Sequence, residues 1–300
     1  MNPYKVRALF YTTKTSDCGN HVRAWNSVFP TAHHARYDHR GICNDWQFIE
    51  EVEKVKPDVV FYIGANDAPG NPKVGTLQVV RKLAPMVNLC SDAGDRPWHK
   101  VLEGYTRKGC FDLQVSIDGA KDAPLDFATL TPVDTRPFEA PLTKTIRCGF
   151  SGSVGRHNSR SEIILALQWF GGLTARDRFK SDTYEDHVDF MKRCRMILNI
   201  SKTGSDLAHH IKGRVLEAAW AKCALLESEG STIGQWFPPD CYITYRDPKE
   251  AAEIIATLPD SQIDSMASRL HEEVKKRFRP EMIYGDILAR VGTAIQKPAA

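Results

Sequence analysis

The sequence predicts an α/β protein of two domains, each built on a parallel sheet. Short apolar segments, typical of buried strands, alternate with segments of helical periodicity in both halves of the chain. A proline-rich stretch of little periodicity lies between the halves. The length of 300 residues suits two domains of about 150 residues each. We therefore predict an N-terminal domain at 1–140, a linker at about 123–142 and a C-terminal domain at 143–300.

The N-terminal half contains strand-like segments separated by helical ones. Expected strands are 6–11, 57–64, 86–90 and 112–118, with an irregular strand and loop at 33–39. Expected helices end near Trp25 or span 45–55 and 77–83. This interval between strands is typical of βαβ units, and βαβ units form parallel sheets.

Polar side chains follow two of these strands. Asp17 and His21 come after the first strand, and Asp92 and Asp95 come after the strand at 86–90. Ligands of open α/β sheets bind beyond the carboxyl ends of the strands, so these four side chains are candidates for a general base or for acceptor contacts. The alternative for Asp17 is that it caps the following helix.

Histidines 33, 34 and 39 look at first like a metal cluster. Their spacing matches no standard zinc pattern, and Pro30 and Gly41 flank the segment. We therefore predict no metal site.

The C-terminal half repeats the alternation. Expected strands are 145–150, 196–200, 223–227 and 243–245, and expected helices are 161–169, 184–194, 212–221, 248–258 and 263–278, before a tail that runs to Ala300. The loop at 151–160 carries small residues and two arginines, which suit a phosphate cradle: Gly152, Ser153, Arg156 and Arg160. The loop has neither the Walker A nor the G-x-G-x-x-G pattern. Helix capping with solvated arginines is the alternative.

The helix expected at 212–221 is the strongest candidate for a ligand site. Gly213 allows close approach of a ligand to the backbone, and amides at a helix N-terminus attract anions. Arg214 and Glu217 share a helix face and offer a cation for a diphosphate and a carboxylate for sugar hydroxyls. Lys202, in the loop before this helix, is a further phosphate partner. The alternative is an exposed Arg–Glu pair that contributes ~0.3 kcal/mol.

A family resemblance rests on two segments of this half, Arg-Met-Ile-Leu-Asn-Ile-Ser at 195–201 and Arg-Val-Leu-Glu-Ala-Ala at 214–219. They resemble the C-terminal domain of CgeB-like glycosyltransferases, which is of the family 1/4-like type, and the match covers about 145–290. The resemblance implies the GT-B fold, in which two Rossmann-like domains face a central cleft. It also implies a nucleotide-sugar site that includes Asn199 and His209. Many relatives have Glu at the position of His209.

Composition bounds the location and the partners. No apolar run approaches the ~18 residues of a membrane span, and the N-terminus lacks the apolar core of a signal peptide. Eight scattered cysteines without a C-x-x-C pair indicate reduced thiols and a cytoplasmic protein. A net charge of +3 is compatible with an anionic ligand or a nucleic acid.

The resulting hypothesis is a hexosyltransferase-like glycosyltransferase that uses a UDP-sugar as co-substrate and needs no cofactor. No D-x-D motif occurs, so we expect a metal-independent reaction with Asp92 as the first-choice base. The acceptor is unidentified, and one candidate is a hydroxymethylated base in phage DNA. The alternatives are a sugar-nucleotide 2-epimerase, a non-catalytic sugar-nucleotide binder and an unrelated two-domain protein.

Overall fold

The computed structural model describes residues 3–13, 18–42, 45–65, 68–152, 154, 158–177, 183–201, 210–211 and 213–296. The backbone divides into two compact units. Unit 1 comprises Met1–Asp134 together with Pro280–Ala300, and unit 2 comprises Thr135–Arg279. Within the described residues, no helix is both long enough and apolar enough to cross a membrane.

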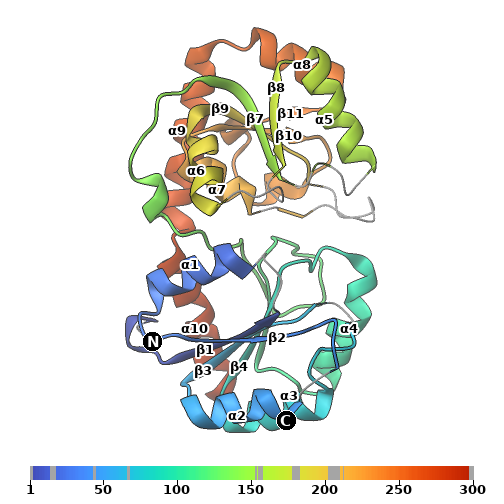
Figure 1. Cartoon of the computed structure of the whole chain (residues 1–300), viewed down its shortest axis with the longest axis vertical. Coiled ribbons are helices and arrows are strands. Elements are labelled where there is room, and N and C mark those ends of the chain that lie inside the picture. The colour runs from blue at the N-terminus through green and yellow to red at the C-terminus, as the bar shows by residue number, and fades with distance from the viewer. Residues whose placement is uncertain are drawn as a thin grey trace. The chain divides into compact units, whose positions relative to one another are not determined.

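Unit 1 is built on a parallel sheet of six strands in the order β2-β1-β3-β4-β5-β6 (Figure 1). The strands are β1 (Ala8–Thr13), β2 (His33–Tyr37), β3 (Val59–Ile63), β4 (Met86–Cys90), β5 (Leu113–Ser116) and β6 (Phe127–Ala128). The helices are η1 (Pro3–Lys5), α1 (Cys18–Val28), α2 (Asp45–Val55), α3 (Val74–Leu83), α4 (Arg96–Arg107) and α10 (Pro280–Gln296).

Alternation along the strands of unit 1 sends aromatic side chains to opposite faces of the sheet. Phe10 and Phe61 are cross-strand partners whose rings stack at 4.7 Å, and they face Tyr284 of α10. On the other face, Tyr11 stacks on Phe48 of α2 at 3.8 Å. Since successive strand residues point to opposite faces, a fully apolar strand such as β3 is buried on both sides by helices.

Unit 2 is built on a parallel sheet of five strands in the order β11-β10-β9-β7-β8. The strands are β7 (Ile146–Gly152), β8 (Leu173–Asp177), β9 (Cys194–Asn199), β10 (Ala224–Ser228) and β11 (Tyr242–Tyr245). The helices are η2 (Arg136–Phe138), α5 (Asn158–Phe170), α6 (Tyr184–Arg193), α7 (Arg214–Trp220), η3 (Thr232–Gln235), η4 (Pro239–Cys241), α8 (Pro248–Thr257) and α9 (Asp260–Arg277).

One face of the second sheet packs against α5, α8 and the start of α9. Its core includes Phe150 and Leu198 from the strands, Ile164 from α5 and Ile255 from α8. Helices α6 and α7 contact the strands β7, β9 and β10. These contacts bring α6 and α7 to the three central strands, and polar side chains of both helices meet there.

The last helix belongs to a different unit from the one predicted from the sequence. The prediction assigned residues 143–300 to the second domain and treated the end as a tail, whereas α10 packs against α1 in unit 1 (Figure 1). The reason is apolar burial: the ring of Tyr284 lies 5.1 Å from Phe29 and 5.7 Å from Phe61, and its exposed fraction is zero.

Helix α4, strand β8 and the two-residue strand β6 were also not predicted from the sequence. Helix α4 begins with Arg96 and Pro97 and carries five charged or histidine side chains, so its apolar face is narrow: Trp98, Leu102 and Tyr105. Strand β8 is a short edge strand that pairs with β7. The segment 33–37, expected to be irregular, is the regular strand β2. The two units divide between Asp134 and Thr135, inside the expected linker.

Candidate functional site

Buried polar side chains gather at the carboxyl ends of β7, β9 and β10. Ser151 lies next to the end of β7, Asn199 ends β9, and Glu227 and Ser228 end β10. The three strands are neighbours in the sheet, and all run parallel. Parallel strands place their carboxyl ends at one edge, which is where ligands of open α/β sheets bind.

Arg214, the first residue of α7, donates hydrogen bonds to the ends of two of these strands, β7 and β9. Its Nε donates to the backbone oxygen of Ser151 at 2.7 Å, and its Nη1 donates to Oδ1 of Asn199 at 2.9 Å. Its guanidinium carbon lies 4.5 Å from the centre of the Phe150 ring, within the range of a cation–π contact. A planar guanidinium held from three sides is a fixed positive charge at this edge of the sheet.

Gly152 leaves the space that the arginine fills. A Cβ added at Gly152 would lie 2.2 Å from Nη2 of Arg214 and 3.3 Å from its Cζ. Real Cβ atoms do not approach other heavy atoms this closely, so any larger residue displaces the guanidinium. The glycine is therefore required by the position of Arg214.

Glu217 lies one turn further along α7 and is only 3% exposed. Its Oε2 is 3.0 Å from Nε2 of His187, and Nδ1 of the same ring is 2.8 Å from Oγ of Ser151. The exposed ion pair considered as an alternative is therefore wrong, because Glu217 is not a surface residue. A buried carboxylate requires hydrogen-bond donors, and His187 supplies one.

Glu227 is a second buried carboxylate at the same edge. Asn199 donates its side-chain amide to Oε2 of Glu227 at 2.6 Å, and Ser228 donates its backbone N–H to Oε1 at 3.1 Å. Burial raises the pKa of Glu227, while hydrogen bonds from Asn199, Ser201 and Ser228 act in the opposite direction. The amide of Asn199 thus bridges this carboxylate and the guanidinium of Arg214.

Several residues predicted for the donor site come together here. Gly152, Asn199, Arg214 and Glu217 belong to the cluster, and Gly213 is the N-cap of α7. Arg160 lies buried in the first turn of α5, so the alternative of a solvated arginine is wrong for this position. Ser153, Arg156, Lys202 and His209 fall outside the described residues.

Other cluster members were missed in the sequence, although two left a signal there. His187 interrupts the apolar face of α6 between Tyr184 and Met191, where a polar side chain needs a buried partner. Glu227 is a carboxylate directly after the apolar residues of β10. Ser151 left no signal beyond its place at a strand end.

The base candidates all belong to unit 1. Asp92 is exposed in the turn after β4, and Asp95 is the N-cap of α4. His21 is buried on α1, which follows β1, and β3 separates β1 from β4 in the sheet. Asp17 lies outside the described residues. The buried carboxylate of Asp118 accepts the backbone N–H of Gly94 at 3.0 Å and so holds the turn that carries Asp92 and Asp95.

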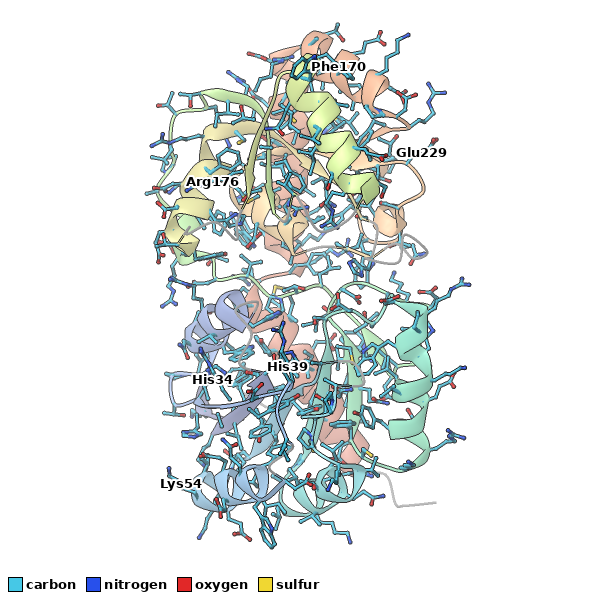
Figure 2. The ribbon with its side chains drawn as sticks, turned by 45° about the vertical axis from the view of Figure 1, so that its right-hand side comes forward. His34, His39, Lys54, Phe170, Arg176 and Glu229 are labelled. Atoms are coloured by element: carbon cyan, nitrogen blue, oxygen red, sulfur yellow. The ribbon has the colours of Figure 1, made fainter. Side chains whose placement is uncertain are left out.

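The histidines of β2 have separate partners. Nε2 of His33 lies 2.7 Å from Oε2 of Glu51, and Nε2 of His34 lies 2.9 Å from Oγ1 of Thr12. Chiefly because burial disfavours the charged ring, the pKa of His34 falls to about 4. His39 lies beyond the strand, in the turn that follows it (Figure 2). Within the described part of the chain, no three His, Cys, Asp or Glu side chains are grouped so as to hold a metal ion.

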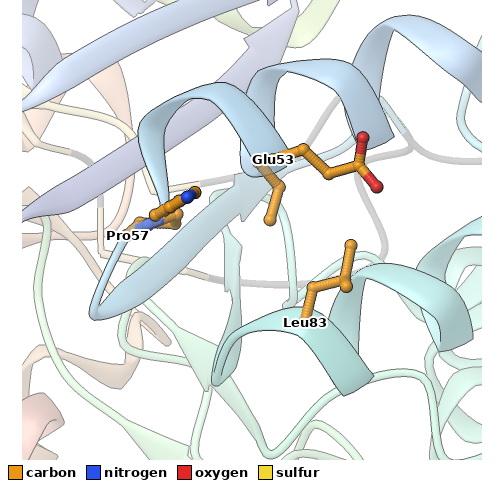
Figure 3. A pocket seen from close by; sticks show the side chains of 5 residues that line it. Glu53, Pro57 and Leu83 are labelled. Carbon is orange, nitrogen blue, oxygen red and sulfur yellow. The ribbon is translucent and has the colours of Figure 1, made fainter.

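A cavity of about 580 Å³ opens on unit 1, lined by Val52, Glu53, Lys56, Pro57 and Leu83 (Figure 3). These residues lie at the ends of α2 and α3 and directly before β3 and β4. The cavity is therefore at the amino edge of the sheet, opposite the edge at which ligands of parallel sheets bind.

Several solved structures have the same overall fold as this chain. Anabaena Alr3699/HepE in complex with UDP and glucose has a TM-score of 0.67 at 10% identity, covering 96% of this chain and 100% of that chain. A glycosyltransferase from Rickettsia africae ESF-5 has a TM-score of 0.62 at 10% identity, covering 98% of this chain and 100% of that one. Sucrose-phosphate synthase from Thermosynechococcus elongatus has a TM-score of 0.62 at 8% identity, covering 96% and 100%. The predicted GT-B fold of two Rossmann-like α/β domains is confirmed.

The sequence comparisons are consistent with this fold. No curated protein sequence matches the chain significantly. A family model described as Glycosyl transferase-like matches residues 136–289, which is just over half of the chain. The matched segment contains the whole polar cluster around Arg214 and Glu217. The chain belongs to this glycosyl transferase-like family.

Proposed function

We propose that this protein transfers a sugar from a UDP-sugar to an acceptor hydroxyl, and that unit 2 holds the nucleotide. The main support for this proposal is that the segment matched by the glycosyl transferase-like family contains the cluster of Arg214, Asn199 and Glu217. The solved relative from Anabaena binds UDP, glucose and UDP-glucose. The segments at 195–201 and 214–219 support the CgeB-like branch of the family.

In the proposed reaction, the bond between the anomeric carbon and the diphosphate oxygen breaks. A bond from that carbon to the acceptor oxygen forms, and UDP leaves. Negative charge grows on the diphosphate, so the fixed guanidinium of Arg214 is the cation assigned to it. The carboxylate of Glu217 is assigned to the ribose hydroxyls, because an ionised carboxylate accepts strong hydrogen bonds from them.

The acceptor proton needs a base if the reaction inverts configuration. Asp92 is the first choice, because it is exposed beyond the carboxyl end of β4. Asp95, His21 and Asp17 are the next candidates. We propose a cytoplasmic enzyme that needs neither a metal ion nor a cofactor. A hydroxymethylated DNA base is one candidate acceptor, and duplex DNA carrying it belongs in the acceptor screen.

The test is incubation of the wild-type protein with individual UDP-sugars, with and without EDTA. The expected result is UDP release in the presence of an acceptor, unaffected by EDTA. A ligand at ~100 times its Kd stabilises the fold by ~2.7 kcal/mol, so UDP binding should also raise Tm without added Mg²⁺. Epimerised donor, or binding without turnover under any acceptor, would contradict the transferase. Strict dependence on a metal ion would contradict its proposed metal independence.

A further inference from the structure

His187 is a polar residue on the core face of α6. It is only 1% exposed, and its neighbours Val188 and Met191 are also buried. A capping box fixes the start of this helix: Thr183 accepts the backbone N–H of Asp186 at 3.1 Å, and Asp186 accepts the backbone N–H of Thr183 at 3.1 Å. The position of the imidazole is therefore set by the helix that carries it.

Both ring nitrogens of His187 contact polar side chains from other elements. Nε2 lies 3.0 Å from Oε2 of Glu217 on α7, and Nδ1 lies 2.8 Å from Oγ of Ser151 on β7. An ionised carboxylate only accepts hydrogen bonds, so the proton on Nε2 points to Glu217. In a neutral ring Nδ1 is then an acceptor, and it receives the hydroxyl proton of Ser151.

This chain of donors fixes the orientation of the Glu217 carboxylate. The bond from His187 engages Oε2, while a carboxylate offers about four lone-pair positions on its two oxygens. A carboxylate can therefore accept both the imidazole and a ligand hydroxyl. Side chains that bind ligands need partners that lock their rotamers, because small misplacements weaken the contact.

The same chain connects the two groups assigned to the nucleotide. The hydroxyl of Ser151 contacts His187, and the backbone oxygen of Ser151 accepts Nε of Arg214. The Arg214 guanidinium and, through His187, the Glu217 carboxylate are thus both held in place by hydrogen bonds to Ser151 at the end of β7. Packing alone does not require this arrangement, since an apolar side chain would fill the space on α6 without needing two buried partners.

We propose that His187 is a positioning residue for nucleotide recognition: its Nε2 holds the Glu217 carboxylate in the orientation that accepts the ribose hydroxyls. The proposal rests on the proposed function, in which Glu217 contacts the ribose. His187 itself touches neither the sugar nor the diphosphate in this assignment.

Two conservative variants separate the two ring nitrogens. In His187→Gln the terminal amide lies near the place of Nε2 and can still donate to Glu217. In His187→Asn the shorter amide lies near the place of Nδ1 and reaches only toward Ser151. If His187 merely fills the core, the two variants should behave alike. A positioning role predicts that Gln rescues recognition and that Asn does not.

The readout is discrimination between UDP and 2′,3′-dideoxy-UDP, measured by calorimetry. The wild-type protein should prefer UDP by at least ~10-fold, since a charge-assisted bond contributes more than the 1.4 kcal/mol that corresponds to one decade. His187→Gln should keep most of this preference, and His187→Asn should reduce it to below ~3-fold. The control is His271→Asn, because His271 also packs on α7 but contacts the backbone oxygen of Ala219.

Wild-type discrimination in a folded His187→Asn protein would overturn the proposal. If that variant does not fold, Ser151→Ala decides, because it removes only the hydroxyl that directs the ring; unchanged discrimination there would also overturn it. Failure of the proposed function looks different. In that case the wild-type protein would bind both nucleotides equally, or neither, before any variant is compared.

Discussion

The guanidinium of Arg214 occupies the space that a side chain at position 152 would need. Adding a single methyl group at this position therefore tests the role of the arginine. In Gly152→Ala the new Cβ would lie 2.2 Å from Nη2 of Arg214. The guanidinium is the far end of a flexible side chain, so we expect it to move while the fold survives. Affinity for UDP should fall ~10-fold or more, the loss of a charge-assisted bond. Calorimetry measures the affinity.

The matched control is Gly75→Ala on α3, where an added Cβ meets nothing within 4 Å. That variant should bind UDP normally and be slightly stabilised, because Ala is the better helix former. Normal UDP binding by a folded Gly152→Ala protein would remove Arg214 from the diphosphate site.

Asp92 allows a second test with a single residue. Asp92→Asn keeps the size of the side chain and removes its ability to take a proton. If Asp92 is the base, turnover should fall by ~10²-fold or more with nucleotide affinity unchanged. Steady-state rates and UDP calorimetry measure the two effects. The control is Asp122→Asn, which changes another exposed carboxylate of unit 1. Near-normal turnover in Asp92→Asn would transfer the role to Asp95, His21 or Asp17.

Among the elements, α10 is the one whose place was not evident from the chain order. It is the last helix, yet Tyr284 packs edge-on against Phe10, Phe29 and Phe61 of unit 1. Tyr284→Ala should therefore destabilise unit 1 by ~3–5 kcal/mol, as expected for a large aromatic removed from a core. Urea denaturation measures the loss of stability, and limited proteolysis of the native protein shows which unit has become easier to cleave.

Trp169→Ala is the control for this prediction, because Trp169 on α5 is 91% exposed and the substitution should change stability by less than ~0.5 kcal/mol. If Tyr284→Ala made residues 135–279 easier to cleave and left unit 1 resistant to the protease, the assignment of α10 to unit 1 would be contradicted.

Elements with strong apolar patterns were predictable, and those with weak patterns were not. Strand β3 and strand β4 are buried along their whole length, and every residue of β3 and every residue of β4 except Asn88 is apolar or aromatic. Helix α4 packs only one narrow face, and β8 is an edge strand. The docking of α10 depends on a contact between residues far apart in the chain, and periodicity carries no information about such a contact.

For the molecule as a whole, the sequence located the candidate site but not its internal contacts. The segment around Arg214 and Glu217 was identifiable from residue types and from the family resemblance. Glu217 contacts His187 of α6, and His187 in turn contacts Ser151 of β7. Both residues are tens of positions away in the chain, and only the fold brings them together with Glu217. The burial of Glu217 was likewise invisible, because charged residues are usually exposed.

In the proposed function, the Glu217 carboxylate binds the ribose of a uridine nucleotide. The decisive measurement is the Kd of UDP for the wild-type protein and for Glu217→Gln, determined by calorimetry. The Gln oxygen still accepts Nε2 of His187, so the fold should be retained, while the loss of the charge weakens the bonds to the hydroxyls. We predict Kd at least ~10-fold higher in the variant, a change of ~1.4 kcal/mol. A folded variant that binds UDP with wild-type affinity would contradict the claim.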